Sequence, residues 1–320
     1  MERWQLTQMQ RLPLEKKIDE SIRLILEWHG HWAGLIYVSF SGGLDSSLLL
    51  HLARQAYPDI PAVFADTGLE YPEIREFVGT HRLVETVRPK MSFREVLEKY
   101  GYPVVSKEQA KYIEEIRHSK SEKLINLRLN GGMLPNGKAG RFGKLSEKWK
   151  FLIDAPFKIS AKCCDMIKKA PLIAYERRSG RWPMTGEMAA ESRRRTTNCL
   201  MYGFNGFARK RPKSLPLGFW TKQDALRYIK EFSVPYCSLY GEISEESGKL
   251  RATGLPGTGC VYCMFGVHLE KNENKFVRLK RTHPHLWEYC IYTLGLGKVL
   301  DYIGVPYSSV RKETKPCGLA

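Results

Sequence analysis

The sequence predicts an α/β protein built on a doubly wound parallel sheet. Short, nearly continuous apolar runs alternate with segments that carry apolar residues at helical spacing, which is typical of a sheet buried on both faces by its crossover helices. A Gly-rich turn, SGGLDSS (41–47), separates the first apolar run from the helix that follows it. Because 43% of the residues are hydrophobic, the chain can bury a sizeable core, and a mostly disordered protein is excluded.

The expected elements follow in order over the first hundred residues. Apolar residues at helical spacing predict an opening helix that stops at Gly30; they are Leu14, Ile18, Ile22 and Ile25. Alternating patterns then predict strands at 34–40, 61–67 and 83–89 and helices at 48–56, 71–82 and 92–101. Ligands bind beyond the carboxyl ends of the strands in such a sheet, so a site is expected at the junctions 39–47 and 65–70.

The rest of the chain is less regular. Its expected features are a basic insertion at about 107–155 with an exposed Gly-rich loop at 130–144, a helix at 221–232, a Gly-rich loop at 241–259 and a helical stretch around 285–295. We therefore expect two domains. The sheet domain would span 1–235 and carry the insertion, and a smaller Cys-containing region would span 236–320 and end in a mobile tail.

Positive charge is the most unusual feature of the composition. The chain has 51 Lys and Arg against 34 Asp and Glu, a formal net charge of +17. Residues 107–150 hold 11 basic against 5 acidic residues, and residues 168–213 hold 12 against 3. This concentration favours a polyanionic partner such as a nucleic acid, a nucleotide or an acidic membrane surface. There is no apolar run of membrane-spanning length and no signal-peptide core, so we expect a cytoplasmic protein without a membrane partner.

The turn at 41–47 has the chemistry of a phosphate site. Its two glycines let the backbone turn so that N–H groups face an anion, and the following helix adds its positive end. Three hydroxyls can donate to phosphate oxygens; they belong to Ser41, Ser46 and Ser47. Asp45 can hold Mg²⁺ or orient the loop. The alternative is an ordinary glycine turn with an N-capping serine.

Two segments carry a resemblance to a known family. SGGLDS (41–46) resembles the PP-loop of the adenine-nucleotide alpha hydrolases, which act at the alpha phosphate of ATP or an adenylyl compound. FADTGLEYPEIREFV (64–78) is similar to the DTG-E-(F/Y)-P-E-T segment of the phosphoadenosine phosphosulfate (PAPS) reductase family. The resemblance implies a Rossmann-like PP-loop fold. It also implies a nucleotide site made of Ser39, Ser41, Gly42, Gly43, Leu44, Asp45, Ser46, Ser47, Asp66, Thr67 and Gly68. A helix or turn cap is the alternative role for Asp66.

A third segment, TGEMAAESRRR (185–195), resembles the family's G-x-R-x-x-E-S-x-x-R stretch, which borders the substrate phosphates. The resemblance implies that Gly186, Glu191 and Arg195 belong to the nucleotide site. Met188 stands where the family usually has arginine, which puts one phosphate contact in doubt. The alternative for the three consecutive arginines is a solvated helix face.

The cysteines are distributed in a pattern that suggests a metal site. KCCDMIKKAPL (162–172) resembles the K-C-C-x-x-R-K-x-x-P-L segment of adenylyl-sulfate reductases, in which a Cys-Cys pair and a distant C-x-x-C ligate a 4Fe–4S cluster. The resemblance implies cluster ligation by Cys163, Cys164, Cys260 and Cys263. Four thiolates also suit zinc, so a structural zinc site and no metal at all are the alternatives. Cys199 is a candidate to replace Cys163 in the ligand set.

Two reactions fit this family resemblance. The first splits ATP into AMP and pyrophosphate with Mg²⁺, adenylates an acceptor, and lets sulfur from a cluster or a persulfide displace AMP. The intact SGGLDS favours it, because reductases of the family usually carry a degraded loop. Asp45, Ser46 and Cys317 would be catalytic, and a cysteine desulfurase or a thioredoxin-like protein would be the donor. The segment 193–213 interleaves aromatic residues with cations, as expected for a nucleic-acid acceptor.

The second reaction is reduction of adenylyl sulfate or PAPS to sulfite by Cys317. Cys317, Gly318 and Leu319 match the Cys-Gly-(Ile/Leu) of the reductases' C-terminal motif, whereas Pro316 and Ala320 replace its Glu and His. A third interpretation is a non-catalytic protein that binds nucleotide and nucleic acid. Members of the family are often dimers, so a homodimer is expected by resemblance.

Overall fold

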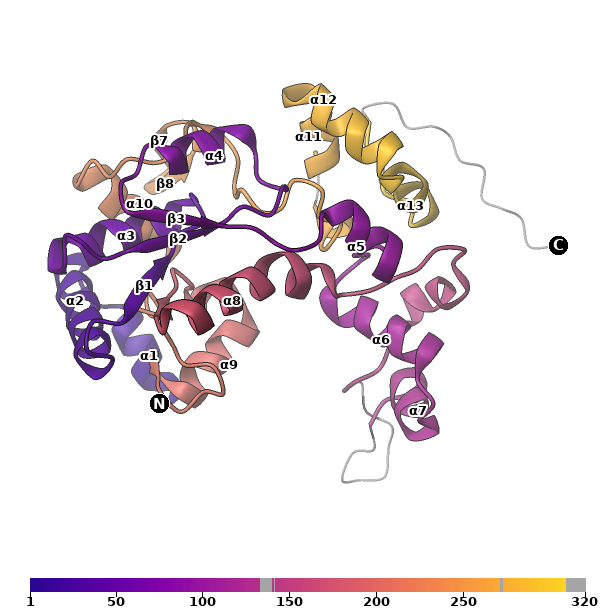
Figure 1. Ribbon diagram of the computed structural model, residues 1–320, viewed down its shortest axis with the longest axis horizontal. Coiled ribbons are helices and arrows are strands. Elements are labelled where there is room, and N and C mark those ends of the chain that lie inside the picture. The colour runs from indigo at the N-terminus through magenta and orange to yellow at the C-terminus, as the bar shows by residue number, and fades with distance from the viewer. Residues whose placement is uncertain (133–139, 141, 271–272, 309–320) are drawn as a thin grey trace. The chain divides into compact units, whose positions relative to one another are not determined.

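The computed structural model describes residues 1–132, 140, 142–270 and 273–308 (Figure 1). The chain forms two compact units. Unit 1 comprises Met1–Pro89 and Lys169–Gly259, and unit 2 comprises Lys90–Lys168 and Cys260–Ala320. Both units are therefore discontinuous along the chain, unlike the contiguous domains expected from chain order. The reason is that the chain leaves the sheet after its third strand and returns to the sheet only before the fourth.

Unit 1 contains the predicted parallel sheet. Its strands are β1 (Ile36–Ser39), β2 (Ala62–Ala65), β3 (Val84–Val87), β4 (Trp182–Met184), β5 (Asn205–Gly206) and β6 (Lys213–Ser214). Their order is β3-β2-β1-β4-β6-β5, and every pairing is parallel except that of β5 with β6. The strand order runs in opposite directions on either side of β1, as in a doubly wound sheet. The predicted fold class is thus confirmed.

Helices pack on this sheet and bury the apolar side chains of its strands. Helix α3 (Leu44–Ala56) packs on β1, and α2 (Leu14–His31) and α10 (Lys222–Glu231) pack on α3. Helix α8 (Ala170–Ser179) packs on β2 and β3, where Tyr175 joins Tyr37 and Val63 in a buried cluster. The remaining helical segments of unit 1 are α1 (Arg3–Gln10), α4 (Pro72–Gly79), α9 (Arg193–Tyr202) and the 3₁₀ turns Ala189–Glu191 and Ser238–Tyr240.

Three local expectations need correction. Gly30 does not stop the opening helix, which continues to His31; the chain turns at Gly34, whose φ of +78° suits glycine. Helix α3 begins at Leu44 instead of residue 48, so part of the phosphate loop forms its first turn. The Gly-rich stretch after residue 241 contains a hairpin of β7 (Ile243–Glu246) and β8 (Lys249–Ala252). Its turn residues, Ser247 and Gly248, both have positive φ, as a tight hairpin turn requires.

The described part of unit 2 is mainly helical, and this includes the described residues of the basic insertion. Its helices are α5 (Phe93–Tyr100), α6 (Lys107–His118), α7 (Glu122–Asn130), α11 (Lys275–Thr282), α12 (Pro284–Glu288) and α13 (Leu296–Tyr302). Shorter 3₁₀ or π segments are Glu147–Asp154, Asp165–Lys169, Val267–Leu269 and Tyr289–Thr293, of which Asp165–Lys169 ends at the first residue of the second part of unit 1. Arg117 ties α6 to the 3₁₀ segment through bonds to the carbonyls of Leu152 and Ile153. Most of the loop expected at 130–144, and the tail with Cys317, lie outside the described residues.

Candidate functional site

The phosphate loop (residues 41–47) joins β1 to α3 and is shaped by its two glycines. Gly42 has a φ of +72°, and a Cβ there would lie 2.9 Å from Ile74 and 3.0 Å from Val78 of α4. Gly43 is the N-cap of α3, and a Cβ there would lie 3.3 Å from the Tyr240 hydroxyl. Both positions therefore favour glycine for reasons of space, and Gly42 also for its backbone conformation.

The serines of the loop hold it together. The Ser46 hydroxyl accepts a hydrogen bond from the Ser41 N–H at 3.2 Å and donates to the Gly43 carbonyl at 2.9 Å. The Ser47 hydroxyl donates to the same carbonyl at 3.1 Å, and both side chains are buried. The first turn of a helix leaves its N–H groups without intrahelical acceptors, and the helix adds a partial positive charge there. The loop thus has a fixed shape at the positive end of α3, which is the property that a phosphate site would use.

Two residues beside the loop were not expected from the sequence. Lys222, the first residue of α10, places its Nζ 3.4 Å from Oδ1 of Asp45. The Tyr240 hydroxyl lies 2.7 Å from the Thr258 hydroxyl, and burial raises the pKa of Tyr240. Neither position belongs to a segment that resembles the family motifs, so the sequence offered no signal for them.

Gly186 is brought to the phosphate loop, as its inclusion in the nucleotide site requires. It follows β4, the neighbour of β1, and a Cβ there would lie 2.7 Å from the Asp45 carbonyl oxygen. The segment after β4 therefore packs directly on the backbone of the loop. The site lies where the strand order reverses, which is where ligands bind in open α/β sheets.

Glu191 and Arg195 form an ion pair with each other. Glu191 also accepts the N–H of Met188 at 2.9 Å, and Met188 itself is buried. Ser192 caps α9 by accepting the Arg195 N–H at 3.3 Å. The methionine that replaces the family's arginine is thus a core side chain. Arg195 is held beside a carboxylate, and both side chains are about a third exposed.

Asp66 lies between two arginines. Its carboxylate is 3.0 Å from Arg75 and 3.2 Å from Arg88, and its side chain is only 14% exposed. It also accepts the N–H of Gly68 at 3.3 Å, so the turn-capping role holds as well. Thr67 donates to Glu70 at 2.7 Å, which fixes the turn after β2. Of the other residues expected at the nucleotide, Ser39 ends β1 and Leu44 is buried at the start of α3.

The four predicted ligand cysteines all belong to unit 2. Cys163 and Cys164 lie just before the π-helical segment Asp165–Lys169, with their sulfur atoms 4.0 Å apart. Cys260 and Cys263 form a tight turn in which the Cys263 N–H donates to the Cys260 carbonyl at 3.1 Å. We call these four residues the cysteine site. Cys199 instead lies in unit 1, buried on α9.

The thiols of the cysteine site affect one another electrostatically. The pKa of Cys163 is raised by its hydrogen bond with Cys164, by burial and by the other cysteines. The pKa of Cys164 is lowered by the same hydrogen bond and by two cations, Lys107 and Lys168. Cys164 is therefore the more acidic thiol of the pair. Burial raises the pKa of Cys263, and the charge of Lys275 acts in the opposite direction.

The donor set of the cysteine site fits an iron–sulfur cluster by its chemistry. Thiolates are the usual ligands of such clusters, and nearby lysines suit an anionic centre. Within the described ranges, no three His, Cys, Asp or Glu side chains are arranged to hold a metal ion. A 4Fe–4S cluster distributes four thiolates over four iron atoms, so its ligands need not converge on one point as zinc ligands do.

In the part of the chain that the structure covers, no helix has both the length and the apolar character needed to cross a membrane.

The family description "phosphoadenosine phosphosulfate reductase domain" matches residues 35–126 and 106–264 of the chain. An adenosine 5′-phosphosulfate reductase of Bacillus cereus is 24% identical over 244 residues, which cover 76% of this chain and 79% of that protein. Some of the curated relatives match only over short stretches: the chain spans 23% of the length of an uncharacterised protein of Methanocaldococcus jannaschii and 18% of that of a phosphoadenosine 5′-phosphosulfate reductase of Photorhabdus laumondii.

Two solved structures are also similar. The PAPS reductase from Candida auris, in a phosphate complex, has 15% identity and a TM-score of 0.38, with 78% of this chain and 98% of that chain covered. The U34-tRNA thiolase from Methanococcus maripaludis, with its 4Fe–4S cluster, has 13% identity and a TM-score of 0.35, with 95% and 84% covered.

Proposed function

The chain belongs to the phosphoadenosine phosphosulfate reductase domain family, and on this premise we propose that it is an ATP pyrophosphatase that drives sulfur transfer. Relatives in the family are enzymes that act on sulfur-containing adenine nucleotides. The observation that carries the proposal is the intact phosphate loop, in which Ser46 and Ser47 brace a turn at the positive end of α3. Such a loop suits a substrate with several phosphates.

In this proposal the residues around the loop bind and orient the triphosphate. The first-turn N–H groups of α3 would hold phosphate oxygens, and Asp45 would hold Mg²⁺ as pyrophosphate leaves. Lys222, now 3.4 Å from Asp45, could then turn its charge to the leaving group. An acceptor oxygen would attack the alpha phosphorus, and the bonding electrons would leave with pyrophosphate. When bound, a 4Fe–4S cluster on the four cysteines would supply a sulfur-handling or electron-transfer centre.

The test is a paired assay on anaerobically purified protein with Mg²⁺. One reaction contains ATP, and the other contains adenylyl sulfate with thioredoxin; pyrophosphate, AMP and sulfite are measured in both. With water as the attacking oxygen in place of the acceptor, we expect pyrophosphate and AMP in equal amounts from ATP. The Asp45→Asn variant should lose this turnover, while Asp19→Asn, at an exposed ion pair on α2, should keep it. Sulfite from adenylyl sulfate without turnover of ATP would contradict the proposal.

A second candidate, reduction of adenylyl sulfate to sulfite, is favoured by one observation. The relatives matched over most of the chain are named as adenosine 5′-phosphosulfate reductases. The Cys317 thiolate would then attack the sulfate sulfur, the bond from that sulfur to the phosphate oxygen would break, and AMP would leave. A thioredoxin-like dithiol would release sulfite from the resulting thiosulfonate through a mixed disulfide, which its second thiol resolves to return Cys317 as a thiol. Cys317→Ser should abolish sulfite formation in the paired assay and leave nucleotide binding unchanged.

We further propose a nucleic acid as the sulfur acceptor, with sulfur delivered by a cysteine desulfurase or a thioredoxin-like protein. Arg193 and Arg194 are exposed at the start of α9, and Arg209 lies over the exposed Tyr202 ring, 4.8 Å from its centroid. Such a surface pairs cations with an aromatic face. Replacing both Arg193 and Arg194 by Gln should reduce the salt slope of duplex binding by about 2. The same slope in wild type and variant would contradict this footprint.

A further inference from the structure

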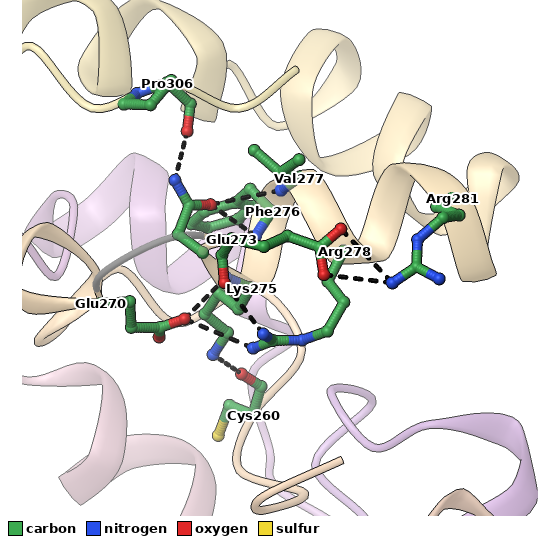
Figure 2. A network of polar contacts seen from close by, with 10 residues as sticks. Cys260, Glu270, Glu273, Lys275, Phe276, Val277, Arg278, Arg281 and Pro306 are labelled. Carbon is green, nitrogen blue, oxygen red and sulfur yellow. Dashed lines mark hydrogen bonds and ion pairs between the residues drawn. The ribbon is translucent and has the colours of Figure 1, made fainter. Parts of the chain in front are cut away.

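The C-x-x-C turn of the cysteine site is held by a lysine from a later segment. Lys275 Nζ donates a hydrogen bond of 2.8 Å to the backbone carbonyl of Cys260, as Figure 2 shows. Lys275 is the first residue of α11, and its side chain is partly buried. Because Cys263 donates its N–H to the same carbonyl, the lysine and the turn share one acceptor. The position of this lysine therefore fixes the position of the turn.

The backbone of Lys275 is itself tightly anchored. Asn274, a buried residue, caps α11 by accepting the N–H groups of Phe276 at 2.9 Å and Val277 at 3.2 Å. Its amide also donates to the Pro306 carbonyl, and the Lys275 N–H donates to Glu270 at 2.7 Å (Figure 2). A capped helix start with these additional bonds is a rigid support, so Lys275 can hold the turn without moving.

Lys275 has a different kind of partner from the two arginines on the same helix, which pair with carboxylates. Arg278 lies 3.4 Å from Glu270, and Arg281 lies 3.1 Å from Glu273. Lys275 donates its side-chain bond instead to a neutral acceptor, the Cys260 carbonyl of the cysteine site. In this network Lys275 is thus the cation directed at the cysteine site.

We propose that Lys275 is a positioning residue of the cysteine site, which holds the C-x-x-C turn and compensates the negative charge of a thiolate-ligated cluster. The inference rests on the cluster in the proposed function. Reduction adds a negative charge to a cluster, so a fixed cation close by stabilises the reduced state and raises the reduction potential. The hydrogen bond to Cys260 would also slow the loss of iron, because the turn could not open without breaking it.

The experiment compares three variants after anaerobic purification and cluster reconstitution. Lys275→Met removes the charge and the hydrogen bond at similar side-chain length, and Lys275→Arg keeps the charge. Arg281→Met removes a charge from the same helix without touching the cysteine site. The readouts are iron per chain, the rate of iron loss to a chelator, and a redox titration followed by visible absorbance.

For Lys275→Met we expect a ratio of oxidised to reduced cluster about tenfold higher at the wild-type midpoint, which for one electron corresponds to about 59 mV. Iron loss to the chelator should be several-fold faster. Lys275→Arg should restore most of the potential, and Arg281→Met should resemble wild type. If Lys275→Met does not fold, as judged by circular dichroism, Lys275→Gln takes its place in the same comparison.

The outcomes separate this inference from the cluster itself. Equal iron in wild type and in the Cys260→Ser/Cys263→Ser double variant would show that the cysteine site does not hold the cluster. The role of Lys275 and the cluster in the proposed function would then both fail, whereas the ATP turnover assigned to the phosphate loop is tested separately by the paired assay. Iron that depends on these cysteines, together with a Lys275→Met variant of unchanged potential and unchanged iron loss, would overturn only the role of Lys275.

Discussion

The phosphate loop of unit 1 and the cysteine site of unit 2 are built in different ways. The loop is seven consecutive residues whose shape comes largely from its own hydrogen bonds, such as those of Ser46 and Ser47 to the Gly43 carbonyl. The cysteine site joins two segments separated by 95 residues of chain, between Cys164 and Cys260. One site is thus local in sequence, and the other depends on how unit 2 folds.

The two sites also differ in what they need to be stable. The loop satisfies its serine hydroxyls internally, so it is formed before any ligand binds. In the cysteine site, neighbouring thiols raise the pKa of Cys163, so full deprotonation is costly without a compensating cation. Metal binding to thiols releases protons and is coupled to folding. We therefore expect the loop to bind nucleotide in protein without iron, whereas the cysteine site should become ordered when the proposed cluster binds.

The largest expected effect concerns which cysteines hold iron. Cys164→Ser should abolish retained iron, because it removes the most acidic thiol of the pair from the site. Cys199→Ser should leave iron content unchanged, since the Cys199 thiol is buried on α9 and burial raises its pKa, which disfavours the thiolate that iron binds. Iron per chain after anaerobic reconstitution measures both. Loss of iron in Cys199→Ser alone would contradict this division and return Cys199 to the ligand set.

Much of the phosphate loop could be predicted because its signal is local. A buried strand, two glycines, three serines and a helix follow one another within 21 residues, from Ile36 to Ala56. The sheet order then brings Gly186 to the loop, which the family resemblance anticipated. The start of α3 was placed too late, because Asp45, Ser46 and Ser47 have low helix propensity and yet form its first turn.

The supporting residues could not be predicted, and the reason is physical. Lys222 lies 177 residues after Asp45, and Tyr240 lies 197 residues after Gly43, so their roles at the loop depend on packing. Lys275 binds a backbone carbonyl. Every residue has such a carbonyl, so no particular side chain in the sequence indicates the partner of this lysine. The division into discontinuous units was missed for a related reason: chain order says nothing of which helices pack together.

A smaller effect is expected where the loop meets the segment after β4. Gly186→Val would place side-chain atoms against the Asp45 carbonyl, since a Cβ there already lies 2.7 Å from it. The loop would have to shift, and nucleotide affinity should fall by about 100-fold, or ~2.7 kcal/mol. Isothermal titration with ATP measures this. Gly257→Ala is the control, because nothing lies within 4 Å of its added Cβ. Unchanged affinity in Gly186→Val would show that the loop tolerates displacement.

The buried ion pair between Lys17 and Asp224 should have a smaller effect, on the stability of the protein. Lys17 is 1% exposed and lies 2.5 Å from Asp224, which caps the helix that begins with Lys222. Lys17→Met should lower the free energy of unfolding by about 2 kcal/mol, less than for a fully buried pair because Asp224 is partly exposed. Lys16→Met removes an exposed pair with Asp19 and should change it by less than about 0.5 kcal/mol. Urea titration measures the free energy of unfolding of both variants. Equal effects would show that the Lys17–Asp224 pair contributes no more to stability than the exposed Lys16–Asp19 pair.

The smallest effect is expected at the end of α2 and in the turn that follows it, which contain no residue of either site. Gly30 lies inside α2 with nothing within 4 Å of an added Cβ, so Gly30→Ala should stabilise the protein by about 0.5–1 kcal/mol through helix propensity. Gly34 has a φ of +78°, so Gly34→Ala should instead destabilise it by about 1 kcal/mol. Iron content and nucleotide affinity should not change in either variant. If the two substitutions shifted thermal unfolding in the same direction, the turn after α2 would not lie at Gly34, and the sequence-based stop at Gly30 would be restored.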